Sequence, residues 1–168
     1  LGDNNVYTNL MAARNLTVAA DAAVRHPKRA AELSVDEEEV ASWRDAAAAM
    51  VIPFDADLNI TQQCEGFTRY RKWDFSATRP DDYPLLLHYH NYLLYSSQVV
   101  KQADLVFALY ACGDRFDPEQ KARDFDYYEG ITVRDSSLSA SIQAIVAAEV
   151  GHLDLAYDYL NETAFTDL

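Results

Sequence analysis

The fold is decided near the end of the chain by residues 136–168, which read "SSLSASIQAIVAAEVGHLDLAYDYLNETAFTDL". Apolar residues recur at helical spacing on both sides of Gly151 and His152, which predicts two helices separated by a very short connection. A connection of this length makes neighbouring helices run antiparallel. The stretch therefore predicts a helical hairpin and favours an all-α fold.

The first half of the chain adds two predicted helices and one irregular region. Helical periodicity runs from Val6 to Val24 and closes at Pro27. The run from Ser34 to Glu37 forms a capping box ahead of an alanine-rich helix that ends before Pro53. Prolines, glycines and scattered aromatic residues over 51–84 then predict a long structured excursion, with a short hairpin near "DLNITQQ".

Two further helices are predicted between this excursion and the final hairpin. Residues 96–114, "SSQVVKQADLVFALYACGD", are apolar nearly all round, as is typical of a buried helix. Asp117 is a capping residue with Gln120 in the capping-box position, which predicts a short helix running to about Tyr128 and ending at Gly130. No strict internal repeat, heptad run or low-complexity segment is visible.

Composition narrows the class of protein. The 168 residues are 49% hydrophobic, which suits a single folding unit. Lys and Arg total 14 against 27 Asp and Glu, and the formal net charge of -13 would repel nucleic acid and anionic membrane surfaces, so we expect neither as a partner. No secretory signal or membrane span is visible, which favours a cytoplasmic protein, and the missing initiator Met suggests a piece of a longer chain.

Two adjacent polar residues, Lys101 and Gln102, interrupt the apolar pattern of the helix predicted over 96–114. Burying a lysine is costly unless its charge is paired or contacts a ligand. Two interpretations stay open. Either the lysine reaches solvent along its aliphatic stem or pairs with an acid such as Asp104, or both residues contact sugar hydroxyls.

A carboxylate and three serines flank the start of the final hairpin. Glu129 follows two tyrosines, and a carboxylate beside aromatic faces suits sugar binding, although a solvated carboxylate is the simpler interpretation. Ser136, Ser137 and Ser139 offer hydroxyls beside the free N–H groups and positive dipole of a helix start, as phosphate sites do. An ordinary helix cap is the simpler alternative for these serines.

Residues that often bind metals are present without a convincing pattern. His88 and His90 alternate in "LLLHYHNYLLY" and could bind a metal from a strand, but no third ligand lies nearby in the sequence. Cys64 and Cys112 are far apart and lack the spacing of a disulfide framework or a zinc site. We therefore predict no metal site.

Several motifs together resemble glycoside hydrolase family 65, which includes maltose, trehalose and kojibiose phosphorylases as well as acid trehalases. The motifs are "DNNVYTN" (3–9), "QVVKQADLVFALY" (98–110) and "FDYYEGITVRDSSLS" (125–139), followed by "AAEVGHLDLAYDYLNETAFTDL" (147–168). They stand in the order and spacing of the family, and the resemblance runs from Asn4 to Leu168.

The resemblance implies that the chain is the C-terminal part of an (α/α)6 barrel of helix pairs. It implies that Lys101, Gln102 and Glu129 contact the nonreducing glucose, and that Ser136, Ser137 and Ser139 bind phosphate. Arg134 stands where many phosphorylases of the family carry His, which keeps a cation beside the anion site. The expected co-substrate is inorganic phosphate, with no cofactor.

The resemblance also implies an incomplete domain. The general acid of the family lies just upstream of the "DNN" motif, so we expect the N-terminal part of the barrel before Leu1 and a further segment after Leu168. The fragment alone is then expected to be inactive, and the full-length protein could be a homodimer, as is common in the family.

Three functions stay open at this point. The first is an inverting phosphorylase that cleaves an α-linked glucose disaccharide of the trehalose, maltose or kojibiose type with phosphate as nucleophile. The second is a hydrolase of the same family that uses water, with Glu129 as a possible base. The third is a non-catalytic helical interaction module, suggested by the acidic composition and the missing general acid.

Overall fold

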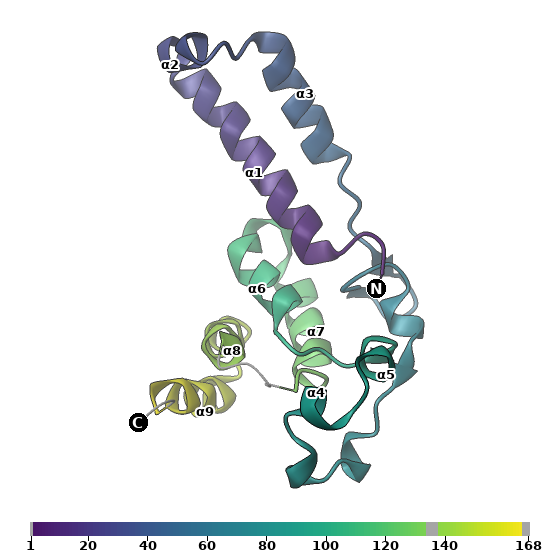
Figure 1. Cartoon of the computed structure of the whole chain (residues 1–168). Helices are drawn as coiled ribbons and strands as arrows, with labels where there is room; N and C mark the ends of the chain where they lie inside the picture. Colours follow the sequence, from purple (N-terminus) through teal and green to yellow (C-terminus); the bar gives the residue numbers. More distant parts are fainter. Residues whose placement is uncertain (1, 134–137, 166–168) are drawn as a thin grey trace.

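Residues 2–133 and 138–165 are described by the computed structural model of the chain. A pair of antiparallel helices, α1 and α3, extends away from the rest, with the short α2 at its far end (Figure 1). Helices α6 and α7 lie at the base of α1, and α8 and α9 lie side by side next to them (Figure 1). The longer helices are α1 (Val6–Arg25), α3 (Glu37–Ala48), α6 (Asp104–Ala111), α7 (Pro118–Glu129), α8 (Leu138–Glu149) and α9 (Leu153–Ala164).

The first predicted helix is confirmed as α1. Its N-terminus is capped by Asn5, whose side-chain oxygen accepts a hydrogen bond of 3.0 Å from the Thr8 amide. Pro27 both ends α1 and opens α2 (Pro27–Glu32), because a proline is readily accommodated in the first turn of a helix, where its missing N–H costs nothing.

The predicted capping box at Ser34–Glu37 is wrong. The α3 helix begins at Glu37. Its cap is Asp36, two residues after Ser34, and the Asp36 carboxylate accepts from the Glu39 amide at 2.8 Å. Ser34 has a left-handed φ of 60° and belongs to the turn between α2 and α3. The sequence pattern predicted the helix correctly, but the Asp36 carboxylate, which lies directly before the helix, caps it in place of Ser34.

The irregular region after α3 is confirmed and is longer than predicted. The strands β1 (Phe54–Asp55) and β2 (Ile60–Thr61) pair antiparallel, as expected for the hairpin near "DLNITQQ". The motif that holds both histidines forms two short helices that the periodicity did not predict. The remaining short elements are η1 (Phe67–Arg69), β3 (Arg71–Lys72), η2 (Phe75–Ala77), η3 (Pro80–Asp82), α4 (Leu85–His88), α5 (Asn91–Tyr95), β4 (Ser97–Gln98) and η4 (Gly113–Arg115).

The helix predicted over 96–114 is wrong in its first half. Strand β4 pairs in parallel with β3, and Val100 pairs with Thr132, so α6 begins only at Asp104. These partners are distant in sequence, and pairing with them overrides the helical preference of the segment. Lys101 and Gln102 therefore precede α6 rather than interrupting it.

Helix α6 is buried on one face rather than all round. Phe107 and Tyr110 are 39% and 49% exposed, and Tyr7 of α1 stacks on the Phe107 ring at a centroid distance of 5.7 Å. The core gathers where α1, α6, α7 and α8 meet. Its fully buried members include Val6, Val106, Leu109, Phe125 and Val146. Within the described residues, no helix has the length and apolarity that crossing a membrane requires.

The last three helices confirm their predictions. The Asp117 carboxylate accepts from the Gln120 amide at 2.7 Å at the start of α7, and Gly130 follows its last residue. The Gln120 side chain bonds elsewhere, donating to Asp124. Gly151, with φ of 93°, turns the chain between α8 and α9, a conformation that a glycine adopts without strain.

Candidate functional site

A short parallel pairing brings two of the predicted site segments together. The Val100 amide donates to the Ile131 carbonyl, and the Val133 amide donates to the Val100 carbonyl, each at 2.9 Å. Residues 131–133 therefore run beside Val100. Lys101 directly follows this pairing, and Glu129, the last residue of α7, precedes it by two residues, although the two residues are 28 positions apart in the sequence.

Lys101 is exposed and lies at the mouth of a small apolar crevice. The crevice is lined by Leu85, Leu86, Leu94, Tyr95, Val99 and Val133. An aliphatic stem against apolar side chains with its ammonium group toward solvent is the usual arrangement for such a lysine. The predicted cost of burying this charge does not arise in the described structure, and the sugar contact of Lys101 stays a prediction.

Glu129 lines a larger hollow, the Glu129 cavity, of about 810 Å³. Side chains from the excursion, the end of α7 and α9 form its wall: Phe75, Tyr83, Pro84, Glu129, Gly130, Thr132, Val133 and Glu162. The Glu129 carboxylate is partly buried, and its Oε1 accepts a hydrogen bond of 2.8 Å from the Tyr159 hydroxyl. Two carboxylates and two aromatic rings around one hollow form a surface that suits a polyhydroxylated ligand.

The aromatic residues beside Glu129 differ from those that the sequence suggested. The Tyr127 hydroxyl donates to Gln98 Oε1 at 2.6 Å, and the Tyr128 hydroxyl donates to the Thr61 carbonyl at 2.9 Å. Burial raises the pKa of Tyr127 to about 12 and that of Tyr128 further. Both tyrosines attach α7 to the excursion.

The rings that line the Glu129 cavity are Phe75 and Tyr83 instead. Sequence reasoning missed them, because they lie more than forty residues before Glu129 in a region without periodicity. Only the three-dimensional path of the excursion brings them to the end of α7.

A second hollow, the Gln102 cavity of about 560 Å³, brings together one predicted sugar contact and one predicted phosphate contact. Gln102 and Ser139 both line it, along with Asp104 and apolar residues of α1, α6 and α8. Ser139 is 2% exposed, and its hydroxyl oxygen accepts from the Ala103 amide at 3.4 Å. Burial raises the pKa of Asp104.

The remaining phosphate-site predictions lie outside the described residues. Arg134, Ser136 and Ser137 belong to that part of the chain. Ser139 is thus the one member of the predicted phosphate loop whose place is described, in the first turn of α8. The phosphate contact stays a prediction for all four residues.

A buried carboxylate that the sequence did not single out lies on α7. Asp124 is fully buried, and its Oδ1 accepts from the Thr61 amide and from Gln120 Nε2, each at 2.8 Å. Its other oxygen, Oδ2, has no hydrogen-bond partner among the described residues. Burial raises its pKa to about 6, against an opposing effect of these two bonds. The "ARDFDYYE" run looks like an ordinary solvated helix face, so nothing in the sequence marks this acid.

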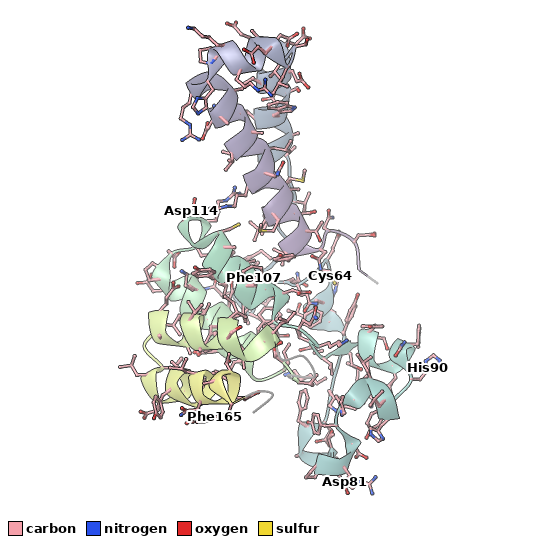
Figure 2. All side chains as sticks on the ribbon, turned by 60° about the vertical axis from the view of Figure 1, so that its left-hand side comes forward. Cys64, Asp81, His90, Phe107, Asp114 and Phe165 are labelled. Carbon is pink, nitrogen blue, oxygen red and sulfur yellow. The ribbon has the colours of Figure 1, made fainter. Side chains whose placement is uncertain are left out.

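Neither His88 nor His90 lines the Glu129 cavity. His88 ends α4, and His90 caps α5 by accepting from the Tyr92 amide at 3.1 Å. Figure 2 shows His90 at the outer end of the excursion. Over residues 2–133 and 138–165, no three His, Cys, Asp or Glu side chains gather as a metal ion would need.

Comparison with known proteins identifies the family. The profile of the glycosyl hydrolase family 65 central catalytic domain matches residues 2–168. An uncharacterized glycosyl hydrolase of Mycobacterium tuberculosis is 58% identical over 165 residues, covering 98% of this chain and 21% of that protein. The α,α-trehalose phosphorylase of Geobacillus stearothermophilus is 45% identical over 174 residues, covering 99% of this chain and 23% of that protein.

A solved structure agrees in fold. It is provisionally named a kojibiose phosphorylase from the human microbiome, and it superposes with a TM-score of 0.80 at 25% identity. The alignment covers 93% of this chain and 22% of the other. The chain thus spans about a fifth of the length of the proteins it matches, and its all-α fold as part of an (α/α)6 barrel is confirmed. The chain belongs to glycosyl hydrolase family 65, within the central catalytic domain of that family.

Proposed function

We propose that this chain is part of an inverting phosphorylase that cleaves an α-linked glucose disaccharide with inorganic phosphate. The observation that carries the proposal is the 45% identity to an α,α-trehalose phosphorylase over 99% of this chain. Trehalose is the first substrate to test, because relatives named kojibiose phosphorylase and maltose phosphorylase have lower sequence identities to this chain, 36% and 35%. The longer protein that would contain this chain is termed the parent protein below.

In the proposed reaction, a phosphate oxygen attacks the anomeric carbon of the nonreducing glucose. The bond from that carbon to the glycosidic oxygen breaks on the opposite face, and a carboxylic acid protonates the departing oxygen. The products are glucose and β-glucose 1-phosphate. We propose that this acid lies upstream of Leu1, so that the chain alone is inactive.

The residues of the chain would divide the substrate between them. Glu129, Lys101 and Gln102 would accept and donate hydrogen bonds to the hydroxyls of the glucose. Ser139, with the unplaced Arg134, Ser136 and Ser137, would hold the phosphate. For Gln102 and Ser139 the division is supported by their shared cavity, because a glucose contact and a phosphate contact must lie close together for in-line attack. Glu129 and Lys101 line two other hollows, and their contacts rest on the family resemblance.

A hydrolase is the second candidate, and one observation favours it. The relative that is 58% identical is named an uncharacterized glycosyl hydrolase, a name that does not mention phosphate. In this reaction water would replace phosphate, and Glu129 would serve as the base that removes its proton. The cytoplasmic location and the homodimer stay predictions under either function.

The proposal is tested on the purified parent protein with trehalose, kojibiose, maltose and nigerose, each with and without phosphate. Glucose and glucose 1-phosphate are measured separately. A phosphorylase releases both in equal amounts and only with phosphate. Equal glucose release without phosphate would select the hydrolase, and no cleavage of any of the four would leave the non-catalytic module.

A further inference from the structure

Helices α8 and α9 bury two polar side chains against each other. Gln143 of α8 is 0% exposed and Tyr159 of α9 is 1% exposed. The Gln143 Nε2 atom lies 3.2 Å from the Tyr159 hydroxyl oxygen. Burying a glutamine at this depth costs free energy unless its polar atoms form hydrogen bonds, and its side-chain oxygen, Oε1, has no partner within the part of the chain that the structure describes. The pair is therefore placed at a cost that packing alone does not explain.

The same hydroxyl continues to the Glu129 cavity. Tyr159 Oη lies 2.8 Å from Glu129 Oε1 at the end of α7. Because an ionised carboxylate can only accept, Tyr159 must donate to Glu129, and its oxygen then accepts from the Gln143 amide. The direction of the whole chain of hydrogen bonds is fixed, from α8 through α9 to the carboxylate.

This chain of bonds defines where the carboxylate can lie. Glu129 sits at the last turn of α7, next to Gly130, and a glutamate side chain has three rotatable bonds. A charge-assisted bond from a rigid, fully buried tyrosine removes much of that freedom. Among the described residues, no hydrogen bond engages the second carboxylate oxygen of Glu129, whose side chain lines the cavity.

We propose that Tyr159 is a positioning residue for Glu129, held in place by Gln143, and that it sets the orientation in which Glu129 binds the glucose. The inference rests on the proposed function, since it assigns the Glu129 cavity to the sugar. Tyr159 itself need not touch the substrate. The buried polar side chains of α8 and α9 then orient the carboxylate at the end of α7.

The test uses the parent protein with Tyr159→Phe, which removes the hydroxyl and keeps the ring. Tyr157→Phe is the matched control, because Tyr157 lies two residues away on the same helix and is 64% exposed. With trehalose at saturating phosphate, Tyr159→Phe should lower kcat/KM by about 10- to 100-fold, as expected when a binding group is misplaced. Tyr157→Phe should stay within about twofold.

A double-mutant cycle distinguishes positioning from packing. Glu129→Ala and the double variant Glu129→Ala/Tyr159→Phe are compared with each single variant, because alanine removes the acceptor of the Tyr159 hydrogen bond, whereas the amide oxygen of glutamine would still accept it. If Tyr159 acts through Glu129, removing its hydroxyl has almost no effect in the Glu129→Ala background. Equal fold losses in both backgrounds, or a Tyr159→Phe enzyme that matches the parent, would overturn the inference.

Failure of the proposed function gives a different result. If the parent protein cleaves trehalose equally without phosphate, a phosphorylase is excluded. The rate of glucose release is then compared among the same four proteins of the double-mutant cycle. If it cleaves no disaccharide, the same four proteins are compared for glucose binding by calorimetry. Coupling between the two residues in either assay supports the positioning role, and additivity contradicts it.

Discussion

Two helical hairpins of this molecule share a shape and differ in what they bury. The pair α1 and α3 buries a few small or apolar residues, and α3 contributes Ala47 alone. The pair α8 and α9 buries Ser139, Gln143 and Tyr159 as well as apolar residues. Figure 1 shows the first pair extending outward and the second lying against α6.

Buried polar side chains between two packed helices indicate a functional role more strongly than apolar packing does. Apolar packing is sufficient to hold two helices together, so buried polar side chains need another explanation. In α1 and α3 the polar contact is an exposed pair, Arg44 with Asp21. In α8 and α9 the polar contact is buried and ends at Glu129. Three comparisons of matched substitutions in the parent protein test this contrast.

The largest expected effect comes from the same substitution in both hairpins. Val146 in α8 is 0% exposed and Val18 in α1 is 51% exposed. Val146→Ala should lower the free energy of unfolding by about 2–3 kcal/mol, from lost burial and a residual cavity. Val18→Ala should change it by less than about 0.5 kcal/mol. Urea unfolding measures both, and equal losses would mean that the outer face of α1 is as well packed as the core.

A smaller effect is expected from the buried acid on α7. The pKa of Asp124 is raised to about 6 from 3.8, so the folded carboxyl binds its proton more tightly than the unfolded one. The contribution of Asp124 to the free energy of unfolding therefore falls as the pH rises from about 4 to about 6, and it is constant above about pH 6. We expect about 1–2 kcal/mol of stability to be lost over this range, less than the full shift would give, because the surroundings relax around the charge.

Asp124→Asn should remove that loss, since an amide does not titrate in this range. Asp45→Asn is the control, because Asp45 is an exposed aspartate on α3. The measurement is the thermal midpoint of each variant between about pH 4 and pH 8. A parent protein and an Asp124→Asn variant with parallel pH profiles would contradict the assignment.

The smallest effect concerns two ion pairs. Arg44 Nη2 and Asp21 Oδ1 are 2.7 Å apart, and both side chains are about half exposed. Lys121 Nζ and Glu149 Oε2 join α7 to α8 at 2.8 Å, and the lysine side chain is only 16% exposed. Lys121→Met should cost about 1 kcal/mol and Arg44→Met less than about 0.5 kcal/mol. The measurement is the urea midpoint of each variant at low and at high salt. A larger loss of stability from Arg44→Met than from Lys121→Met would contradict this prediction.

The sequence predicts the elements whose signals are local. Asp117 caps α7, Gly130 follows it, and Gly151 turns the final hairpin, because each feature depends only on residues within a few positions. The all-α fold follows from the same short-range signals. The cap of α3 was predicted two positions too early, because Ser34 and Asp36 are both suitable capping residues and local sequence does not choose between them.

The start of α6 and most of the site could not be predicted in this way. Residues 97–100 are kept out of the helix because Ser97, Gln98 and Val100 pair with residues 71, 72 and 132, and a window around Lys101 contains none of these partners. Glu129 was singled out by its neighbours and by the family motif. Tyr159 looks like an ordinary core residue of α9, because its partner is 30 positions away.

The most direct test of the account is the turnover of Glu129→Gln in the parent protein. Glutamine keeps the size of the side chain and removes the charge. We expect kcat/KM for phosphate-dependent cleavage of trehalose to fall by about 100-fold, which corresponds to the loss of a charged hydrogen bond to the substrate, while the melting temperature changes by less than about 2 °C. Activity within about threefold of the parent protein would show that the Glu129 cavity is not the glucose site.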